Sequence, residues 1–229
     1  MTVYFDANNI YDAGTKAMQS SKFKHSTQLF EMNHLLTTAH IRRGFITGNY
    51  KPDPGNKFPI NERGHPRYIT SNTMVDKTVN HLLCDEVLTP SISKYLIYDN
   101  GASQKGKGVA FHRRRFEARL HQYFMQNGTN EGYILLVDFS GYYANIPHDK
   151  CLEVLQTFLE REVGDPETLA ITEMLLPLIF KTFEQDVSRF TDKEIEAMMA
   201  GKIDPMLNYG VDPALLTGEK MLRKGVDIG

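Results

Sequence analysis

The short apolar run at residues 133–137, followed at once by Asp138, is the feature that most constrains the fold. Such a run suits a strand that is buried on both faces. A strand of this kind would fix the direction of the Asp138 carboxylate, and burying that charge without a partner is costly. We therefore expect Asp138 to meet a cation or hydrogen-bond donors. The alternative is that Asp138 simply caps the turn or helix that follows.

Composition allows one sizeable core or two small subdomains and excludes some functional classes. The 229 residues are 41% hydrophobic and 24% charged, as in an ordinary globular protein. The net charge of -2 means that contact with a polyanion would need local clusters of Lys and Arg. Cys84 and Cys151 lie far apart and have no C-x-x-C partner, which argues against a zinc site and fits a reducing compartment. We expect both thiols to be buried.

Targeting signals are missing from the sequence. No stretch approaches the roughly 18 apolar residues of a membrane span. The first residues are polar and acidic, unlike a secretion signal. We therefore expect a cytoplasmic protein that does not contact a membrane.

Apolar spacing predicts helices over much of the chain. We expect one or two helices over 20–43 with a stop at Gly44, and a helix over 76–88 that Pro90 ends. A basic helix is predicted over 109–124. Further helices are predicted over 149–162 and 167–183, the latter with a kink at Pro177, and a short one within a solvated acidic segment at 184–204.

Residues 50–70 predict a β-hairpin. Short alternating runs flank Arg63-Gly64-His65-Pro66, whose residue types favour a turn. Charged residues would then lie near the tip of the hairpin.

The residues around Asp138 resemble the first palm motif of reverse transcriptases. The match is ILLVDFSGYYANIPHDKCL: an apolar strand, Asp, four residues, an aromatic, then a small residue, Ile and His. In that family the Asp binds two metal ions, which implies Mg²⁺, or Mn²⁺ in its place, at a catalytic Asp138. Hard divalent cations require such oxygen ligands. The resemblance implies that the backbone carbonyl of Phe139 is a further ligand of the metal ions.

The same resemblance assigns roles to the next residues. It implies that a turn exposes backbone N–H groups to the nucleotide triphosphate at Ser140, Gly141 and Tyr142. Tyr143 would lie under the sugar and exclude a 2′-hydroxyl, which favours deoxynucleotides. The alternative is that Tyr142 and Tyr143 are ordinary core or surface aromatics.

The hairpin region is similar to the fingers of bacterial reverse transcriptases, in which G-x-Y precedes a hairpin containing G-x-x-R-x-I. Here the matching stretches are GNYKPDP and KFPINERGHPRYIT. The resemblance implies that Arg67 clamps the nucleotide phosphates, as a bidentate guanidinium can. Arg63 or Lys57 would be a second basic contact; solvated hairpin charges are the alternative. Asp76 would be a structural charge at a helix start.

A third stretch, SQKGKGVAFHRRRFEARLHQY, resembles the segment that packs against the template strand. Gly106 and Gly108 would let the backbone approach a nucleic acid. Six bases stand against Glu117 alone, which fits a phosphate-backbone footprint; a solvated helix face is the equally open alternative. The six are Lys105, Lys107, Arg113, Arg114, Arg115 and Arg119.

The resemblance implies an α+β fold with largely helical right-hand polymerase fingers, a β-hairpin and an incomplete palm sheet. We expect a helical extension at 1–45, fingers at 46–130 and a partial palm with a helical insertion at 131–229. RKGVDIG resembles the opening of the next palm motif, but no Y-x-D-D occurs in the 229 residues. The isolated chain, as part of a longer polymerase or a natural piece kept for binding, is therefore expected to be nearly inactive.

The implied function is RNA-directed DNA polymerisation in a bacterial or phage retroelement. The implied partners are an RNA template, a primer and dNTPs. Two rival hypotheses stay open. One is a non-catalytic nucleic-acid-binding module derived from such an enzyme. The other is a globular domain unrelated to polymerases.

Overall fold

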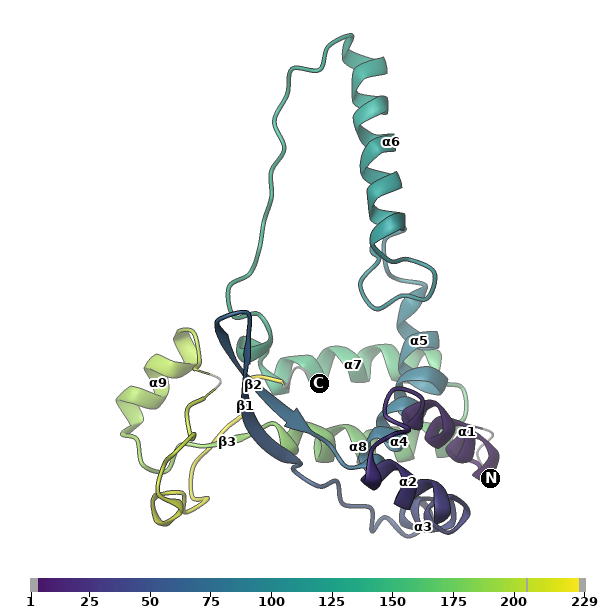
Figure 1. Cartoon of the computed structure of the whole chain (residues 1–229), viewed down its shortest axis with the longest axis vertical. Coiled ribbons are helices and arrows are strands. Elements are labelled where there is room, and N and C mark those ends of the chain that lie inside the picture. Colours follow the sequence, from purple (N-terminus) through teal and green to yellow (C-terminus); the bar gives the residue numbers. More distant parts are fainter. Residues whose placement is uncertain (1–3, 205, 227–229) are drawn as a thin grey trace. The chain divides into compact units, whose positions relative to one another are not determined.

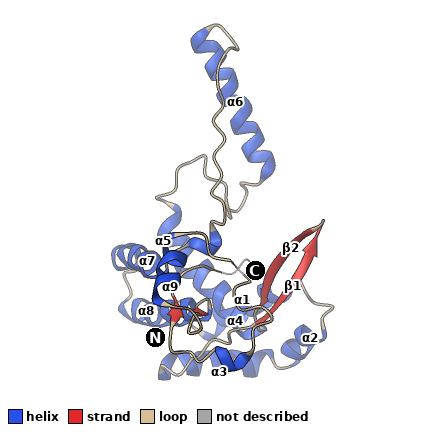
Figure 2. Ribbon diagram, turned by 90° about the vertical axis from the view of Figure 1, so that its left-hand side faces the viewer, coloured by secondary structure: helices blue, strands red, loops and turns tan. Residues whose placement is uncertain are grey.

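The computed structural model describes residues 4–204 and 206–226, and of residues 65–68 it describes the backbone alone. The described residues are mostly helical, with two small antiparallel sheets (Figures 1 and 2). This confirms the α+β class predicted from the sequence. Packing divides the chain into two compact units, Met1–Ser91 with Ser140–Gly229, and Ile92–Phe139. The predicted domain boundaries at residues 45 and 130 come from the resemblance to polymerases. They stay a prediction, because a division by packing does not test them.

The first helices of the larger unit build one side of its core. These are α1 (Ala7–Met18), α2 (His25–Met32), α3 (His34–Thr47) and α4 (Met74–Leu82). The Asp6 carboxylate caps α1 by accepting a hydrogen bond from the backbone N–H of Asn9 at 2.8 Å. Ile10 on α1 and Val79 and Leu82 on α4 are fully buried where the two helices pack together.

The predicted stop at Gly44 is wrong, because α3 runs on to Thr47. Gly44 packs closely against Tyr50, and Gly48, with φ +66°, provides the left-handed cap that ends the helix. The predicted end at Pro90 is also wrong. After α4 the chain continues as a π-helix (Leu83–Leu88) and then as α5 (Thr89–Ser93), and Pro90 lies in the first turn of α5, where its missing N–H is tolerated.

The predicted hairpin is present as β1 (Asn56–Glu62) and β2 (His65–Ser71), joined by Arg63 and Gly64. These two loop residues have φ values of +53° and +83°. Both are left-handed, as a type I′ turn requires, and that turn matches the twist of paired strands. The turn is shorter than predicted, because His65 and Pro66 already belong to β2.

Two long helices complete the main core. They are α7 (His148–Glu162) and α8 (Pro166–Thr182), close to the predicted bounds. The Asp165 carboxylate caps α8 through the Thr168 N–H. Leu159 and Leu175 are buried in the same cluster as Ile10 and Val79. Pro177 lies inside α8, and a kink there stays a prediction.

A second, smaller core lies between residues 185 and 222. Here β3 (Gln185–Asp186) pairs with β4 (Met221–Leu222), and α9 (Asp192–Ala200) lies between them in sequence, with a short 3-10 helix at Pro213–Leu215. Val187, Ile203 and Leu222 are almost fully buried. The short helix of the acidic segment was predicted, but the prediction of a solvated segment is wrong at Val187 and Ile203, because both are buried against Leu222.

The unit Ile92–Phe139 contains α6 (Val109–Asn127) and a long extended segment that runs back in the opposite direction (Figure 1). The predicted basic helix is therefore present, and Gly128, at φ +66°, ends it. None of the residues of α6 is buried.

The predicted buried strand at 133–137 is wrong for this chain. The segment is extended, but no described strand pairs with it, and the side chain of Leu136 is 89% exposed. An apolar run reports a preference for burial, whereas a strand also needs a neighbour to accept its backbone hydrogen bonds.

Both cysteines depart from the prediction of burial, since Cys84 is exposed and Cys151 is half-buried. Among the described residues, no helix is both long and apolar enough to cross a bilayer.

Candidate functional site

The turn after Asp138 is closed by its own backbone and by Asn145. Gly141 has φ +64°, a left-handed conformation that favours glycine. The Nδ2 of Asn145 donates to the carbonyl oxygen of Gly141 at 2.8 Å, and the Asn145 N–H donates to the Tyr142 carbonyl at 3.1 Å. Ser140, Gly141 and Tyr142 therefore form a compact turn that leads into a 3-10 helix at Tyr143–Asn145.

Tyr142 and Tyr143 pack edge to face, with ring centroids 5.4 Å apart. Both side chains are exposed, at 57% and 49%. Neither is a core aromatic, so a surface role or a binding role remains. Exposed rings beside a turn can stack against a sugar or a base.

The segment that contains Lys224 and Gly225 lies directly against the 3-10 helix that follows this turn. The Val226 N–H donates to the Tyr143 carbonyl at 2.9 Å, and the Gly225 N–H donates to the Ile146 carbonyl at 2.8 Å. A Cβ on Gly225, whose φ is +92°, would lie 3.1 Å from the carbonyl oxygen of Ala144. A side chain at this position would be strained and crowded, which favours glycine. The structure brings together two segments that the sequence analysis treated separately; residues 227–229 of RKGVDIG lie outside the described part.

Two lysines connect the end of α9 to its surroundings: Lys224, within RKGVDIG, and Lys202, which was not among the predicted site residues. The buried Nζ of Lys224 donates to the carbonyls of Met199 at 2.8 Å and Gly201 at 3.1 Å, at the end of α9. Such a cation suits the carbonyl end of a helix. The Nζ of Lys202 reaches the Ser140 hydroxyl at 3.4 Å. Lys224 belongs to RKGVDIG, but no motif marks Lys202 in the sequence.

Asp138 itself is exposed and is the last residue but one of the unit Ile92–Phe139, and Phe139 is 72% exposed. Asp138 offers the oxygen ligand that magnesium prefers. However, no cluster of three or more His, Cys, Asp or Glu side chains occurs among residues 4–204 and 206–226. Among the described residues, Asp138 therefore stands as a single candidate ligand.

The three basic residues predicted to contact phosphates lie at different positions of the hairpin: one at its tip and one on each strand. Arg63 lies exposed at the tip, and the backbone of Arg67 pairs with Ile60. The side chain of Arg67 lies outside the described residues. Lys57 is exposed on β1, opposite Thr70. Arg63 and Lys57 therefore both stay open as the second basic contact.

Asp76 joins the G-x-Y segment to α4. Its buried carboxylate accepts hydrogen bonds from the Tyr50 hydroxyl at 2.6 Å, the Thr73 hydroxyl at 2.6 Å and the Asp53 N–H at 3.2 Å. Burial first, and then the neighbouring Asp76 carboxylate, raise the pKa of the Tyr50 phenol well above its ordinary value. Asp76 is thus a structural charge in the first turn of α4, as predicted.

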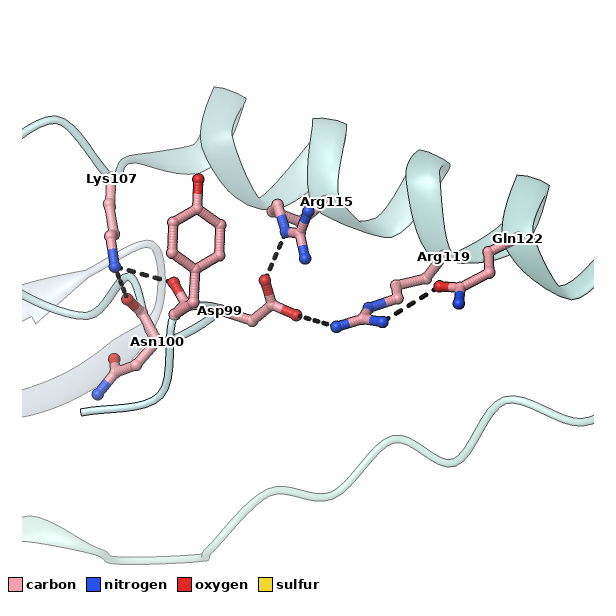
Figure 3. Close-up of polar contacts among 7 residues, drawn as sticks. Asp99, Asn100, Lys107, Arg115, Arg119 and Gln122 are labelled. Atoms are coloured by element: carbon pink, nitrogen blue, oxygen red, sulfur yellow. Dashed lines mark hydrogen bonds and ion pairs between the residues drawn. The ribbon is translucent and has the colours of Figure 1, made fainter. Parts of the chain in front are cut away.

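The basic segment contains an acid that the sequence analysis missed. Figure 3 shows the Asp99 carboxylate between Arg115 and Arg119, with the Arg119 Nη2 at 3.0 Å from Oδ2. Hydrogen bonds from Arg115, and then from Arg119, lower the pKa of Asp99 to about 2. Asp99 precedes α6 by ten residues in sequence, so helical spacing could not reveal the pair.

Other bases of this segment are also engaged. The Nζ of Lys107 donates to the Tyr98 carbonyl at 2.8 Å and lies 5.0 Å from the centroid of the Tyr98 ring. Arg113 pairs with Glu117 at 2.9 Å. Lys105 and Arg114 have no hydrogen bond or ion pair with other described residues. The segment therefore presents fewer free charges than the six expected.

Comparisons with known proteins give no independent assignment. No protein-family model matches this chain, and no curated protein matches it significantly. A functional hypothesis therefore depends on the residues themselves.

Proposed function

We propose that this chain belongs to an RNA-directed DNA polymerase, a reverse transcriptase of bacterial or phage retroelement type that acts in the cytoplasm. The observation that carries the proposal is the segment from Asp138 to Tyr143. In it, a carboxylate stands two residues before the start of a glycine-centred turn, and an exposed tyrosine lies five residues after the acid. The hydrogen bonds of Val226 with Tyr143 and of Gly225 with Ile146 support the proposal, because they join both segments that carry the resemblance.

The proposed reaction adds a dNMP to a primer 3′-hydroxyl on an RNA template and releases pyrophosphate. Asp138 would be one ligand of Mg²⁺ or Mn²⁺, and the carbonyl of Phe139 would lie beside it; the bound ion would stabilise charge on the phosphates. The remaining ligands would come from the substrate and from residues other than those described.

Residues of the chain would bind and orient the nucleotide. Ser140, Gly141 and Tyr142 would offer backbone N–H groups to the triphosphate, as backbone turns do at other phosphate sites. Tyr143 would fill the space of a 2′-hydroxyl. Arg67, with Arg63 or Lys57, would contact the phosphates from the hairpin.

Primer extension tests the proposal. Protein expressed from the complete reading frame is incubated with a primed RNA template, Mg²⁺ and either dNTPs or rNTPs. The expected result is extension with dNTPs and far less with rNTPs. Extension with neither set of nucleotides contradicts the proposal.

A second candidate, a non-catalytic nucleic-acid-binding module, is favoured by one observation. Lys105 and Arg114 are exposed bases without partners among the described residues, and Lys105 adjoins Gly106 in a loop whose glycines allow close approach. Such a protein would bind RNA in a salt-dependent manner and would not extend a primer.

A further inference from the structure

Lys202 stands out because its backbone is anchored on both sides. The carbonyl of Gly201, just before it, accepts a hydrogen bond from the buried ammonium of Lys224 at 3.1 Å. Ile203, just after it, is 1% exposed and lies in the smaller core. An anchored backbone limits where the Lys202 side chain can reach, so its position reflects the fold more than a freely moving surface lysine would.

The stem of Lys202 lies across Gly141. A Cβ placed on Gly141 would be 2.8 Å from the Cε of Lys202 and 3.2 Å from its Cγ. The absence of a side chain at Gly141 therefore leaves the space that the lysine stem occupies. From there the ammonium reaches the hydroxyl of Ser140 at 3.4 Å.

No acid neutralises this ammonium within the part of the chain that the structure describes. The nearby lysines differ in this respect. Lys220 pairs with Asp192 at 2.7 Å, and Lys224 is buried against backbone carbonyls. The carboxylate of Asp204, two residues after Lys202, accepts a hydrogen bond from the Met206 N–H instead. An unpaired cation beside a turn attracts an anion.

We propose that Lys202 binds the triphosphate of the incoming nucleotide at the turn of Ser140, Gly141 and Tyr142. This inference rests on the proposed function and adds a residue from the α9 segment to its nucleotide site. A lysine ammonium on a flexible stem is a common phosphate ligand. On nucleotide binding, the Lys202 ammonium would exchange its contact with the Ser140 hydroxyl for contacts with the β- and γ-phosphates.

The test measures binding of inorganic triphosphate, dTTP and thymidine to the chain by titration calorimetry in the presence of Mg²⁺. Lys202→Met keeps the stem that covers Gly141 and removes the charge. We expect it to weaken triphosphate and dTTP binding about tenfold, the order of one charge-assisted hydrogen bond. Lys202→Arg should restore most of the affinity, and thymidine binding should not change.

Lys193→Met is the matched control, because Lys193 is an exposed lysine on α9. It should bind all three compounds as the wild type does. Equal affinities of Lys202→Met and Lys193→Met for triphosphate overturn the proposal, and so does a wild-type chain that binds no triphosphate.

Primer extension separates this inference from the proposed function. If the complete protein extends a primer and Lys202→Met leaves the KM for dTTP unchanged, the inference about Lys202 fails alone. If the wild type extends no primer although Lys202 binds triphosphate, the polymerase proposal fails and the anion site stands.

Discussion

The Nε2 of the buried His148 lies within hydrogen-bonding distance of the carbonyl oxygen of Gly225. Because a carbonyl can only accept, His148 must carry its proton on Nε2 in this contact. The backbone N–H of His148 also donates to the Arg223 carbonyl at 3.2 Å, and the His148 ring packs edge-on against Phe180. His148 thus holds the segment of Gly225 against the start of α7 through both its side chain and its backbone.

Replacing His148 with Ala should destabilise the larger unit. The change removes a buried hydrogen bond and leaves a cavity against Phe180, which together cost about 2–4 kcal/mol of unfolding free energy. Urea denaturation followed by circular dichroism measures the loss. His81→Ala, at an exposed position of α4, is the control and should change little. Equal stability of both variants would mean that His148 is not an anchor.

Replacing Asp99 with Asn should strengthen RNA binding. The change frees the guanidinium groups of Arg115 and Arg119, which the Asp99 carboxylate now holds. Filter binding to a single-stranded RNA at several salt concentrations measures the effect, and the salt dependence should become steeper. Glu117→Gln gives the same change in net charge but frees Arg113 alone, so its effect should be smaller. Weaker binding by Asp99→Asn would contradict this prediction.

Asp99 should titrate near pH 2. Its pKa in the folded chain is lowered from 3.8 to about 2, mainly by the hydrogen bond from Arg115 and then by that from Arg119. Because the folded value lies below the unfolded one, the contribution of this group to stability is complete above about pH 4 and is lost as the pH falls toward 2. The carboxyl carbon shift of Asp99, followed by NMR, measures the midpoint. An ordinary midpoint near 3.8 would show that the arginines do not hold it.

Replacing Arg63 with Asn should remove the charge at the tip of the hairpin and keep the turn. Asn tolerates the left-handed conformation that Arg63 adopts at φ +53°, so the hairpin should persist. If Arg63 contacts nucleotide phosphates, the KM for dNTPs should rise about tenfold in primer extension. Lys57→Gln is the companion variant on β1. An increase in KM with Lys57→Gln alone would assign the second basic contact to Lys57.

Local patterns predicted the elements that depend on local chemistry. Helical spacing located α7 and α8 within one residue of their observed starts, and turn residues located the hairpin. The ends at Gly44 and Pro90 failed because packing around Gly44 and a new helical start at Thr89 override residue preference.

Features that depend on distant partners were not predictable from the sequence. The extended segment at 133–137 has the composition of a buried strand, but composition does not supply a neighbouring strand. The pairing of Asp99 with Arg119 joins residues 20 positions apart, and the contact of Lys202 with Ser140 joins residues 62 positions apart. The roles of Asp138, Tyr143 and Arg67 stay predictions, since they require substrate to be seen.

The substitution Asp138→Ala tests the central proposal most directly. It should be made in the protein expressed from the complete reading frame and assayed for RNA-templated primer extension with dNTPs and Mg²⁺, with RNA affinity measured in parallel. The proposal predicts that extension is abolished, because the metal-binding carboxylate is lost, while RNA affinity stays close to that of the wild type. Extension by Asp138→Ala at the wild-type rate would contradict it.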